Sequence, residues 1–371
     1  MADWDVILAP ATVQVRVILH EANSLMNTLR LLNVADIHSG LAEWLYTTAN
    51  DMDDDRKMRN QIVADVVDHV AHVMNSSAAR DSMSFLELIK DVEQTPVNDF
   101  REGMLVGIRE KREDYPGDDA LLASRESYIK YIHDLLAEKY AKKGHDFDDG
   151  AWDMRYDYIM NPQQLKDDSI EHLRHMWDKY LKAEWKRIKP TLQEAVDAFS
   201  QVDFSDMTAF EAIETVMGRN MRGKDDFETH IRQAEILTFV PSAHLGPYIG
   251  WGPSEDWPRH IVFLFGARSP KNALMKSTAL GRSELLVRLN ALADETRLKI
   301  LELLTQHDEL CAQDFITELD LSQSSASRHL RQLTASGFVS ERRRDVAKCY
   351  SLNHDRIDDT ISALKDFLQK E

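Results

Sequence analysis

The side chains best suited to chemistry lie in one short stretch near the C-terminal end, between residues 322 and 348. Small hydroxyl and amide groups come first and guanidinium groups follow, which is the mixture that a helix needs to enter the major groove of DNA. Short side chains let the backbone approach, while Gln, Ser and Arg can bond base edges or hold phosphates. The candidate contacts on this helix are Gln323, Ser324, Ser325, Ser327, Arg328, His329 and Arg331.

A helix running from Ser322 to Leu333 must position these groups. Ser322 is a good N-cap residue, since its hydroxyl can accept from a free backbone amide of the first turn. Ala326, Leu330 and Leu333 share one face, which should point into a core. Gly337 stands where a left-handed residue would end the helix. The polar groups therefore fall on the opposite, outer face.

Two shorter helices are expected before this one. Asp294 can cap the first, and Asp320-Leu321 forms the turn after the second. The apolar residues of the first are Leu298, Leu301 and Leu304, and those of the second are Cys311, Phe315, Ile316 and Leu319. Helix, helix, tight turn and polar helix are thus expected in that order.

Two strands and a basic loop follow the polar helix. Residues 338–342 and 348–352 alternate in the manner of strands. The loop and the start of the second strand add the remaining candidate DNA contacts, Arg342, Arg343, Arg344 and Lys348. Such a loop suits the DNA backbone or the minor groove. The alternative to DNA binding is a solvated helix face followed by an ordinary basic hairpin. The apolar spacing, the N-cap, the glycine at the helix end and the basic hairpin together favour DNA binding.

Residues 282–352 resemble a winged helix-turn-helix of the ArsR type, the arsenical-resistance repressor family. The stretches that carry the resemblance are 286–304 and 321–339, and the region is about a fifth of the chain. The resemblance implies that the helix at 322–333 enters the major groove and that the following hairpin is the wing. It also implies a homodimeric repressor that releases DNA when an inducer binds.

The sequence departs from the family at its metal-sensing positions. Metal-sensing members often carry a Cys-x-Cys pair in the helix before the recognition helix, whereas residues 309–314 contain only Cys311. The other common site uses histidines of the C-terminal helix, and residues 355–370 contain none. Soft ligation needs several converging donors. We therefore expect no metal site and no cofactor. The wing also lacks the glycine often found at its tip.

A stripe of apolar residues predicts a homodimer. The stripe runs at i, i+4, i+7 and i+11 along a terminal helix and consists of Ile357, Ile361, Leu364 and Leu368. A small domain has little core left to cover it, so a partner helix is the expected cover. Two subunits would offer two recognition helices to half-sites about one DNA turn apart. Alternatively, the stripe packs on the first helix of its own domain, around Leu285 and Leu289.

Composition indicates a cytoplasmic protein. The chain has 371 residues and a formal net charge of −18, yet residues 322–352 hold six basic and two acidic residues. The two cysteines, Cys311 and Cys349, are not expected to form a disulfide framework, which suits a reducing compartment. The N-terminus lacks the features of a signal peptide, and no apolar run approaches membrane-spanning length. No membrane partner is expected.

The N-terminal region is expected to be mostly helical. Strands are predicted at 13–19, 235–240 and 260–265, and they could pair as a small antiparallel sheet that closes the helical domain. The predicted fold is therefore mainly α with small β elements and a C-terminal winged helix-turn-helix. We place an N-terminal sensing or dimerisation domain at 1–270, a linker at 271–281 and the DNA-binding domain with its dimerisation helix at 282–371.

Candidate reactive groups in the N-terminal region are weak. Two triplets have the i, i+4, i+7 spacing of a shared helix face and could donate to a metal ion: Asp65, His69 and His72, and Glu171, His175 and Asp178. Charged helices produce such triplets by chance, so a solvated face is the preferred interpretation. His244 lies in a turn where it could line a pocket or simply be hydrogen-bonded. No phosphate loop, nucleophile elbow or Cys-x-x-Cys motif occurs, and no catalytic residue is predicted.

Three functions remain open at this stage. The favoured one is a sequence-specific transcriptional repressor that binds double-stranded DNA, with an N-terminal domain that responds to a small-molecule effector or binds a protein. The second is a helical interaction module that uses the winged helix for protein docking, which the arginines of residues 328–344 disfavour. The third is an enzyme fused to a DNA-binding domain, which would need a titratable cluster in a pocket.

Overall fold

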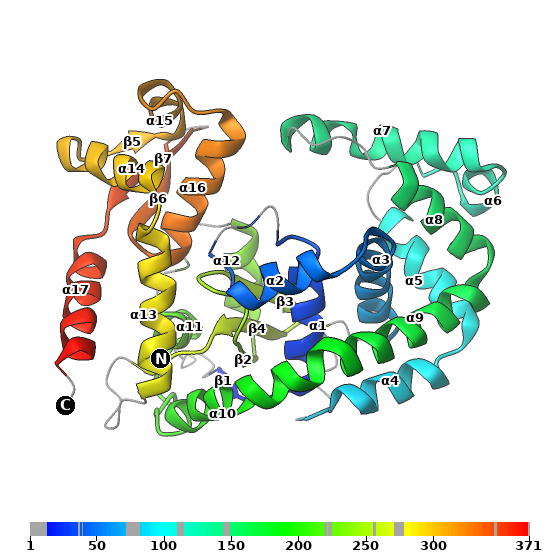
Figure 1. Cartoon of the computed structure of the whole chain (residues 1–371), viewed down its shortest axis with the longest axis horizontal. Helices are drawn as coiled ribbons and strands as arrows, with labels where there is room; N and C mark the ends of the chain where they lie inside the picture. The colour runs from blue at the N-terminus through cyan, green and yellow to red at the C-terminus, as the bar shows by residue number, and fades with distance from the viewer. Residues whose placement is uncertain are drawn as a thin grey trace, which may run out of the picture.

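The computed structural model describes residues 13–35, 38, 40–71, 82–109, 115–143, 149–218, 221, 225–254, 257–270, 278–344 and 347–369. Figure 1 shows a mainly helical molecule with two small sheets, which confirms the predicted fold class. None of the helices in the described ranges is long and apolar enough to cross a membrane.

The N-terminal part consists of helices around a four-stranded sheet. Its first elements are β1 (Gln14–Val17), α1 (Glu21–Leu32), α2 (Glu43–Asp51), α3 (Asp54–Ala71), α4 (Phe85–Gln94), α5 (Val97–Arg109), α6 (Asp118–Leu121), α7 (Arg125–Lys143) and α8 (Asp149–Met160). The others are α9 (Pro162–Met176), the π-helical turn η2 (Trp177–Leu181), α10 (Lys182–Phe199), α11 (Ala209–Met217), α12 (Asp225–Gln233), β2 (Ile236–Ser242), β3 (Ile249–Pro253) and β4 (His260–Gly266).

The sheet has the strand order β1-β2-β4-β3, and its direction differs from the prediction. The three predicted strands are present, but β1 pairs with β2 and β2 with β4 in parallel. The antiparallel neighbour of β4 is β3, which lies outside the three predicted strands. Because β3 leads the chain back beside β4, β4 runs in the same direction as β2.

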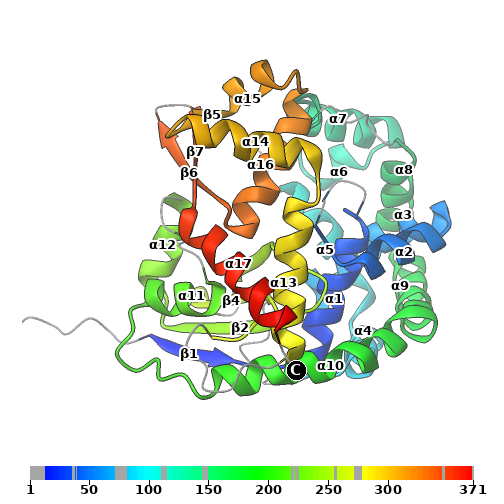
Figure 2. The same ribbon diagram turned by 60° about the vertical axis from the view of Figure 1, so that its left-hand side comes forward.

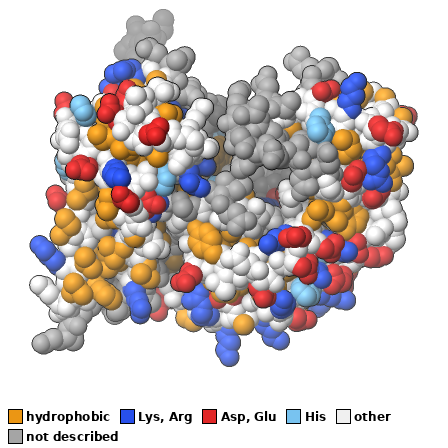
Figure 3. All heavy atoms as spheres, turned by 45° about the horizontal axis from the view of Figure 1, so that its top comes forward, with side chains coloured by type: hydrophobic (Ala, Val, Ile, Leu, Met, Phe, Trp, Pro, Cys, Tyr) orange, Lys and Arg blue, Asp and Glu red, His pale blue; other side chains and the backbone are white. Residues whose placement is uncertain are grey.

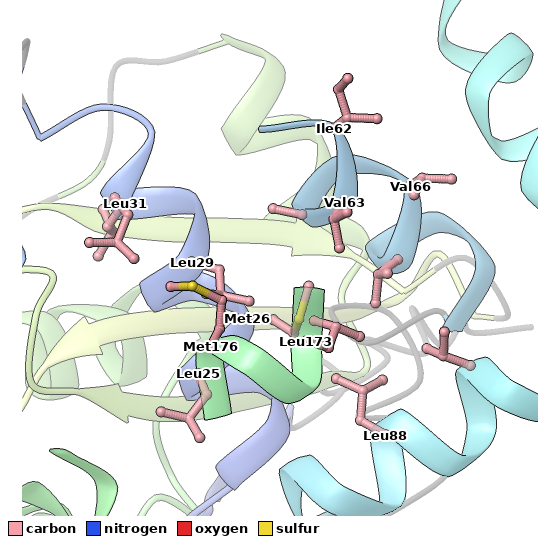
Figure 4. Close-up of a cluster of buried hydrophobic side chains, with 14 of the residues drawn as sticks. Leu25, Met26, Leu29, Leu31, Ile62, Val63, Val66, Leu88, Leu173 and Met176 are labelled. Carbon is pink, nitrogen blue, oxygen red and sulfur yellow. The ribbon is translucent and has the colours of Figure 1, made fainter. Parts of the chain in front are cut away.

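Both faces of the sheet are covered by helices, as is usual for parallel strands. Phe239, Phe263 and Phe265 point to one face and pack with α11, α12 and the end of α10. Val240 and Leu264 point to the other face and join the larger core built from α1 to α10. Figure 4 shows part of that core, with side chains of α1, α3, α4 and α9 directed toward one another.

The long helical segment after Asn161 contains an internal proline. Proline usually ends or kinks a helix, but α9, η2 and α10 follow one another without a break from Pro162 to Phe199, with Pro190 inside α10. An internal proline costs a helix about 3 kcal/mol. Ile188 and Leu192, on either side of it, are buried in the main core and hold the helix in place.

The C-terminal part has the order of a winged helix-turn-helix. Its elements are α13 (Thr278–Leu292), α14 (Glu295–Gln306), β5 (Leu310–Cys311), α15 (Ala312–Glu318), α16 (Gln323–Ser336), β6 (Val339–Arg344), β7 (Ala347–Leu352) and α17 (His354–Leu368). Ile300, Phe315, Leu330 and Phe338 form the centre of its own core. The predicted boundaries at 270 and 282 stay a prediction, since residues 271–277 lie outside the described part.

Candidate nucleic-acid interface

The predicted caps fix the ends of the two helices that matter most. The Asp294 carboxylate accepts from the backbone amide of Arg297 at 3.0 Å and begins α14. The Ser322 hydroxyl accepts from the amide of Ser325 at 3.2 Å and begins α16. Gly337 ends α16 in the left-handed conformation, with φ +81. All three caps were predicted from residue type alone, and all three are confirmed.

The two faces of α16 divide as the spacing predicted. Ala326, Leu330 and Leu333 are buried on the inner face. Most of the candidate DNA contacts are exposed on the outer face, namely Gln323, Ser324, Ser327, Arg328 and Arg331. Ser325 is half-buried, and its backbone amide donates to the Ser322 hydroxyl. The exposed set therefore occupies the N-terminal half and middle of the helix, the part that reads base edges in helix-turn-helix proteins.

His329 is not placed with the other candidate contacts. Its side chain is buried, and Nδ1 lies 3.5 Å from the Asp294 carboxylate at the start of α14. Burial lowers the pKa of His329, so the ring is neutral near pH 7 and contributes no charge to the outer face. The prediction that His329 belongs to the DNA-contacting surface is wrong, because the N-cap of α14 lies against that position of α16.

Arg297 fixes the geometry of the domain, and its role escaped sequence reasoning. Its Nε donates to the carbonyl of Ala291 at 2.6 Å, and Nη2 donates to that of Asn290 at 2.8 Å. These are carbonyls at the end of α13, so one buried guanidinium joins α13 to the first turn of α14. A charged residue in the first turn of a helix is usually expected to face solvent, so the sequence did not predict that Arg297 is buried.

The wing is formed by β6 and β7, and its arginines lie in a strand. Arg342, Arg343 and Arg344 belong to β6 instead of the predicted loop, whose residues 345–346 lie outside the described part. Arg342 and Arg344 are 68% and 64% exposed, and both approach the carboxylate of Glu309. Lys348 Nζ lies 2.8 Å from the carboxylate of Glu341. The side chain of Arg343 lies outside the described part.

The two cysteines are joined by a disulfide, which corrects the expectation that they form none. Cys311 was expected inside a helix, but it lies in β5 and is the N-cap residue that precedes α15. Because β5 pairs antiparallel with β7, Cys311 falls directly opposite Cys349. The short strand β5 was not predicted, and only its register brings the two sulfurs together.

The apolar stripe of the C-terminal helix is divided between two environments. Helix α17 lies along α13 (Figure 2), and Ile357 packs against the core of its own domain. Leu364 is half-buried, whereas Ile361 and Leu368 are 48% and 73% exposed. Leu286 of α13 is 51% exposed as well. Hydrophobic side chains gather on the lower part of the left-hand lobe in Figure 3, where α13 and α17 lie. Intramolecular packing thus covers one side of the stripe only.

A cluster of charges joins the two parts of the chain around Glu284 of α13. One oxygen of its carboxylate, Oε1, lies 2.8 Å from Arg268 after β4, 2.5 Å from Arg288 of α13 and 3.7 Å from Arg356 of α17. Arg356 also donates to the carbonyl of Ser336 in the last turn of α16, at 2.9 Å. The N-terminal part is therefore connected to the end of the recognition helix through one carboxylate.

The cluster holds more positive than negative charge. Burial on its own would raise the pKa of Glu284, but the charges of Arg268 and Arg288 outweigh it and hold that pKa below its ordinary value. Burial and the charges of Arg288 and Arg268 lower the pKa of Arg356 to about 10. Among the described residues, Nε of Arg288 has no hydrogen-bond partner. The negative charge of Glu284 thus offsets the repulsion among the three neighbouring guanidinium groups.

The N-terminal part also contacts α16 directly. Gly40, in the loop before α2, lies so close to the side chain of Gln332 that an added Cβ would come within 2.5 Å of its Nε2. Gln332 is 1% exposed. The contact lies at the C-terminal half of α16 and leaves the exposed polar residues of its first half uncovered.

The N-terminal candidate residues form internal pairs. His244 is 1% exposed, with Nε2 2.7 Å from Glu184 Oε1 and Nδ1 2.9 Å from Thr28 Oγ1. Burial would raise the pKa of Glu184, but hydrogen bonds from His244 and Arg187 lower it to about 2. His244 is therefore hydrogen-bonded inside the protein and does not line an open pocket.

In each of the two candidate metal-binding triplets, one carboxylate is paired with an arginine. Asp65 pairs with Arg155 at 2.6 Å and Glu171 with Arg56 at 2.9 Å, while His72 lies outside the described residues. Across the described ranges, no group of three acidic, histidine or cysteine side chains is arranged to hold a metal ion.

Comparison with known proteins agrees with the C-terminal geometry. The family model "Bacterial regulatory protein, arsR family" matches residues 294–341. The transcriptional repressor SdpR of Bacillus subtilis (strain 168) is 35% identical over 80 residues, which cover 22% of this chain and 88% of SdpR. This chain belongs to the ArsR family. The matched segment begins at the cap of α14 and runs through α16 into the wing.

Other relatives match the same region of this ArsR-family protein. The arsenical resistance operon repressor of Escherichia coli (strain K12) is 51% identical over 62 residues, which are 17% of this chain and 53% of that repressor. The HTH-type transcriptional regulator MJ1325 of Methanocaldococcus jannaschii is 33% identical over 76 residues, 20% of this chain and 85% of its own length. The chain thus spans about half the length of the E. coli repressor, and each match covers about a fifth of this chain.

Proposed function

We propose that this chain is a sequence-specific transcriptional repressor that binds duplex DNA through α16 and the β6–β7 wing. The observation that carries the proposal is the exposed polar face of α16. Gln323, Ser327, Arg328 and Arg331 project from its first half and middle, beside a basic hairpin. Relatives named as repressors match the C-terminal region of this chain. We place its action in the cytoplasm.

The arrangement assigns different tasks to the helix and the wing. Arginine and glutamine on a helix in the major groove can make paired hydrogen bonds to guanine and adenine, each worth about 1–3 kcal/mol of discrimination. The wing cations lie to one side on an extended hairpin, which suits contact with phosphates. Sequence choice should therefore depend on α16, and sequence-independent affinity on the wing.

We further propose that the protein acts as a homodimer through α13 and α17. Leu286, Ile361 and Leu368 leave an apolar face uncovered on these two neighbouring helices. A second copy offers the same face, so a two-fold contact would bury both. Two recognition helices would then meet half-sites about one DNA turn apart, which requires a pseudo-palindromic operator.

The N-terminal domain is proposed to control the DNA-binding part in response to a small-molecule effector or a protein partner. Two connections reach the recognition helix from it, and both end in the C-terminal half of that helix. One is the contact of Gly40 with Gln332, and the other runs from Arg268 through Glu284 and Arg356 to the Ser336 carbonyl. A shift at either connection would move α16 relative to the wing.

Selection of bound fragments from a random duplex library tests the proposal. Wild type should enrich a pseudo-palindrome, and Arg328→Ala should weaken binding to the recovered duplex by about tenfold or more. Arg174→Ala serves as the matched control, because Arg174 is 61% exposed on α9 of the N-terminal part. A folded wild-type chain that enriches no sequence, or an Arg328→Ala variant that binds as tightly as the control, would refute the assignment.

A further inference from the structure

The wing arginines share one carboxylate. Glu309 lies between α14 and β5, and its side chain is 15% exposed. Both of its oxygens engage Arg342: Nε donates to Oε1, and Nη2 donates to Oε2 at 2.8 Å. Nη1 of Arg344 lies 3.8 Å from the same Oε2. The two arginines are more than 60% exposed, so they project toward solvent from a less exposed acidic anchor.

The strand geometry explains why one acid reaches two arginines. Alternate residues of a strand point to the same face, so Arg342 and Arg344 lie on one side of β6. Glu309 precedes β5, which is joined to the same sheet through β7. The neighbouring residue Glu341 points the other way and pairs with Lys348. Each wing cation whose side chain is described therefore has a carboxylate partner before any DNA arrives.

We propose that Glu309 is a positioning residue of the DNA interface, because it restrains Arg342 and Arg344 and so limits their sequence-independent attraction to phosphate. This inference rests on the proposed DNA-binding function. It adds a role for an acidic residue outside α16 and outside the basic hairpin.

The restraint of the wing arginines by Glu309 can be measured through the salt dependence of DNA binding, which reflects counterion release. A cation that neutralises a DNA phosphate releases a condensed counterion, and the salt dependence of binding steepens by about 0.9 log unit for each such contact. When an arginine must leave Glu309 to reach a phosphate, the freed carboxylate attracts a cation in its place. The net release is then smaller, and the affinity gained from the wing is reduced. The hydrogen bond from Arg342 lowers the pKa of Glu309, so the carboxylate is charged at neutral pH.

Restraint of phosphate contacts changes the affinity for DNA of any sequence. Phosphate contacts add the same affinity to every duplex, whereas contacts from α16 add affinity to the operator only. Weakening the phosphate contacts therefore lowers the affinity for random DNA and for the operator by the same factor and leaves the ratio of the two affinities unchanged. Glu309 would thus keep the wing useful for positioning without letting it dominate the binding.

The test compares Glu309→Gln with wild type on a fluorescein-labelled random-sequence duplex over a range of salt concentrations. Glutamine keeps the size of the side chain and removes its charge. The variant should bind random DNA more tightly at low salt, and its salt slope should steepen by up to about 1.8 for two released arginines. On the duplex recovered by selection, the operator affinity at low salt should rise by the same factor, so the ratio of operator affinity to random-DNA affinity should stay unchanged.

Two further variants separate this effect from a change in net charge. Glu302→Gln removes the same charge from the exposed side of α14 and should leave the salt slope unchanged. In an Arg342→Gln, Arg344→Gln background, Glu309→Gln should have no further effect on the slope. Equal slopes for wild type and Glu309→Gln, or an equal effect of Glu309→Gln in both backgrounds, would overturn the inference alone. A wild-type chain that binds neither duplex would overturn it together with the proposed function.

Discussion

The charge cluster around Glu284 predicts a large loss of stability when its carboxylate is neutralised. In Glu284→Gln, the guanidinium groups of Arg268, Arg288 and Arg356 would remain close together with no carboxylate between them. Removing one partner of a buried ion pair costs about 3–5 kcal/mol. The Glu284 side chain keeps 21% exposure, so water screens part of this effect. We therefore expect the lower part of that range, about 3 kcal/mol.

Removal of one arginine should be much milder than removal of the acid. In Arg356→Met, two arginines still share the carboxylate and the repulsion among cations falls. The principal loss is the bond from Arg356 to the carbonyl of Ser336, worth about 1 kcal/mol. Combined with Arg356→Met, Glu284→Gln should lose less than it does alone, because fewer cations are left without a partner. A double-mutant cycle therefore measures the repulsion directly.

Urea unfolding of the full chain at neutral pH is the assay, with Glu302→Gln as the charge-matched control. The Glu284 contribution should also depend on pH. Because the pKa of Glu284 is lowered in the fold, its stabilisation is present above the pKa of an unfolded glutamate, about 4.3, and is lost as the pH falls through the folded value. The reasoning is refuted if Glu284→Gln loses no more stability than Arg356→Met, or if its loss is undiminished in acid.

Three other outcomes follow from the contacts described above. Replacing Ile361 and Leu364 by Glu should convert a dimer into a monomer in light scattering and weaken operator binding steeply; a wild-type monomer that binds its operator tightly would exclude the dimer. Zinc and arsenite should leave operator binding by the oxidised protein unchanged, because the Cys311 disulfide withholds both thiolates; metal-dependent release in fluorescence anisotropy would contradict this. Gly40→Ala should lose about 1–3 kcal/mol in thermal unfolding, because φ is +83 there and Gln332 occupies the space; an unchanged melting temperature would show that the loop is not pressed against α16.

Local chemistry made the DNA-binding elements predictable. Asp294, Ser322 and Gly337 act within one turn of their own helices, so their effect is encoded by residue type and position. The inner face of α16 follows from helical spacing in the same way. These features locate the recognition helix and its exposed residues without knowledge of any other part of the fold.

The errors concern partners that are distant in sequence. His329 has the spacing of an edge residue, but it is buried because the start of α14 lies against it. Cys311 and Cys349 meet only because β5 joins β7 in one particular register. The direction of β4 depends on β3, whose short, glycine-containing sequence reads as loop. Periodicity cannot determine any of these, since each depends on which elements become neighbours.

Helix α1 shows why sequence periodicity predicts little about the N-terminal region. It is buried almost all round, so it has no polar outer face to contrast with an apolar inner one. Its buried polar groups are matched by specific partners far along the chain: the Ser24 hydroxyl donates to the Pro241 carbonyl, and Thr28 meets His244. Such groups resemble a reactive site in sequence and prove to be internal hydrogen bonds in the fold.

The same distinction bears on function. The residues proposed to choose a DNA sequence lie together on α16 and are visible in the sequence. The residues proposed to set how strongly the protein holds DNA, and to connect the N-terminal part with α16, are acids paired across the fold. Glu309 lies 33 positions from Arg342, and Glu284 lies 72 positions from Arg356. In a chain of net charge −18, the acidic residues placed next to the few functional arginines therefore determine how much of their charge DNA can use.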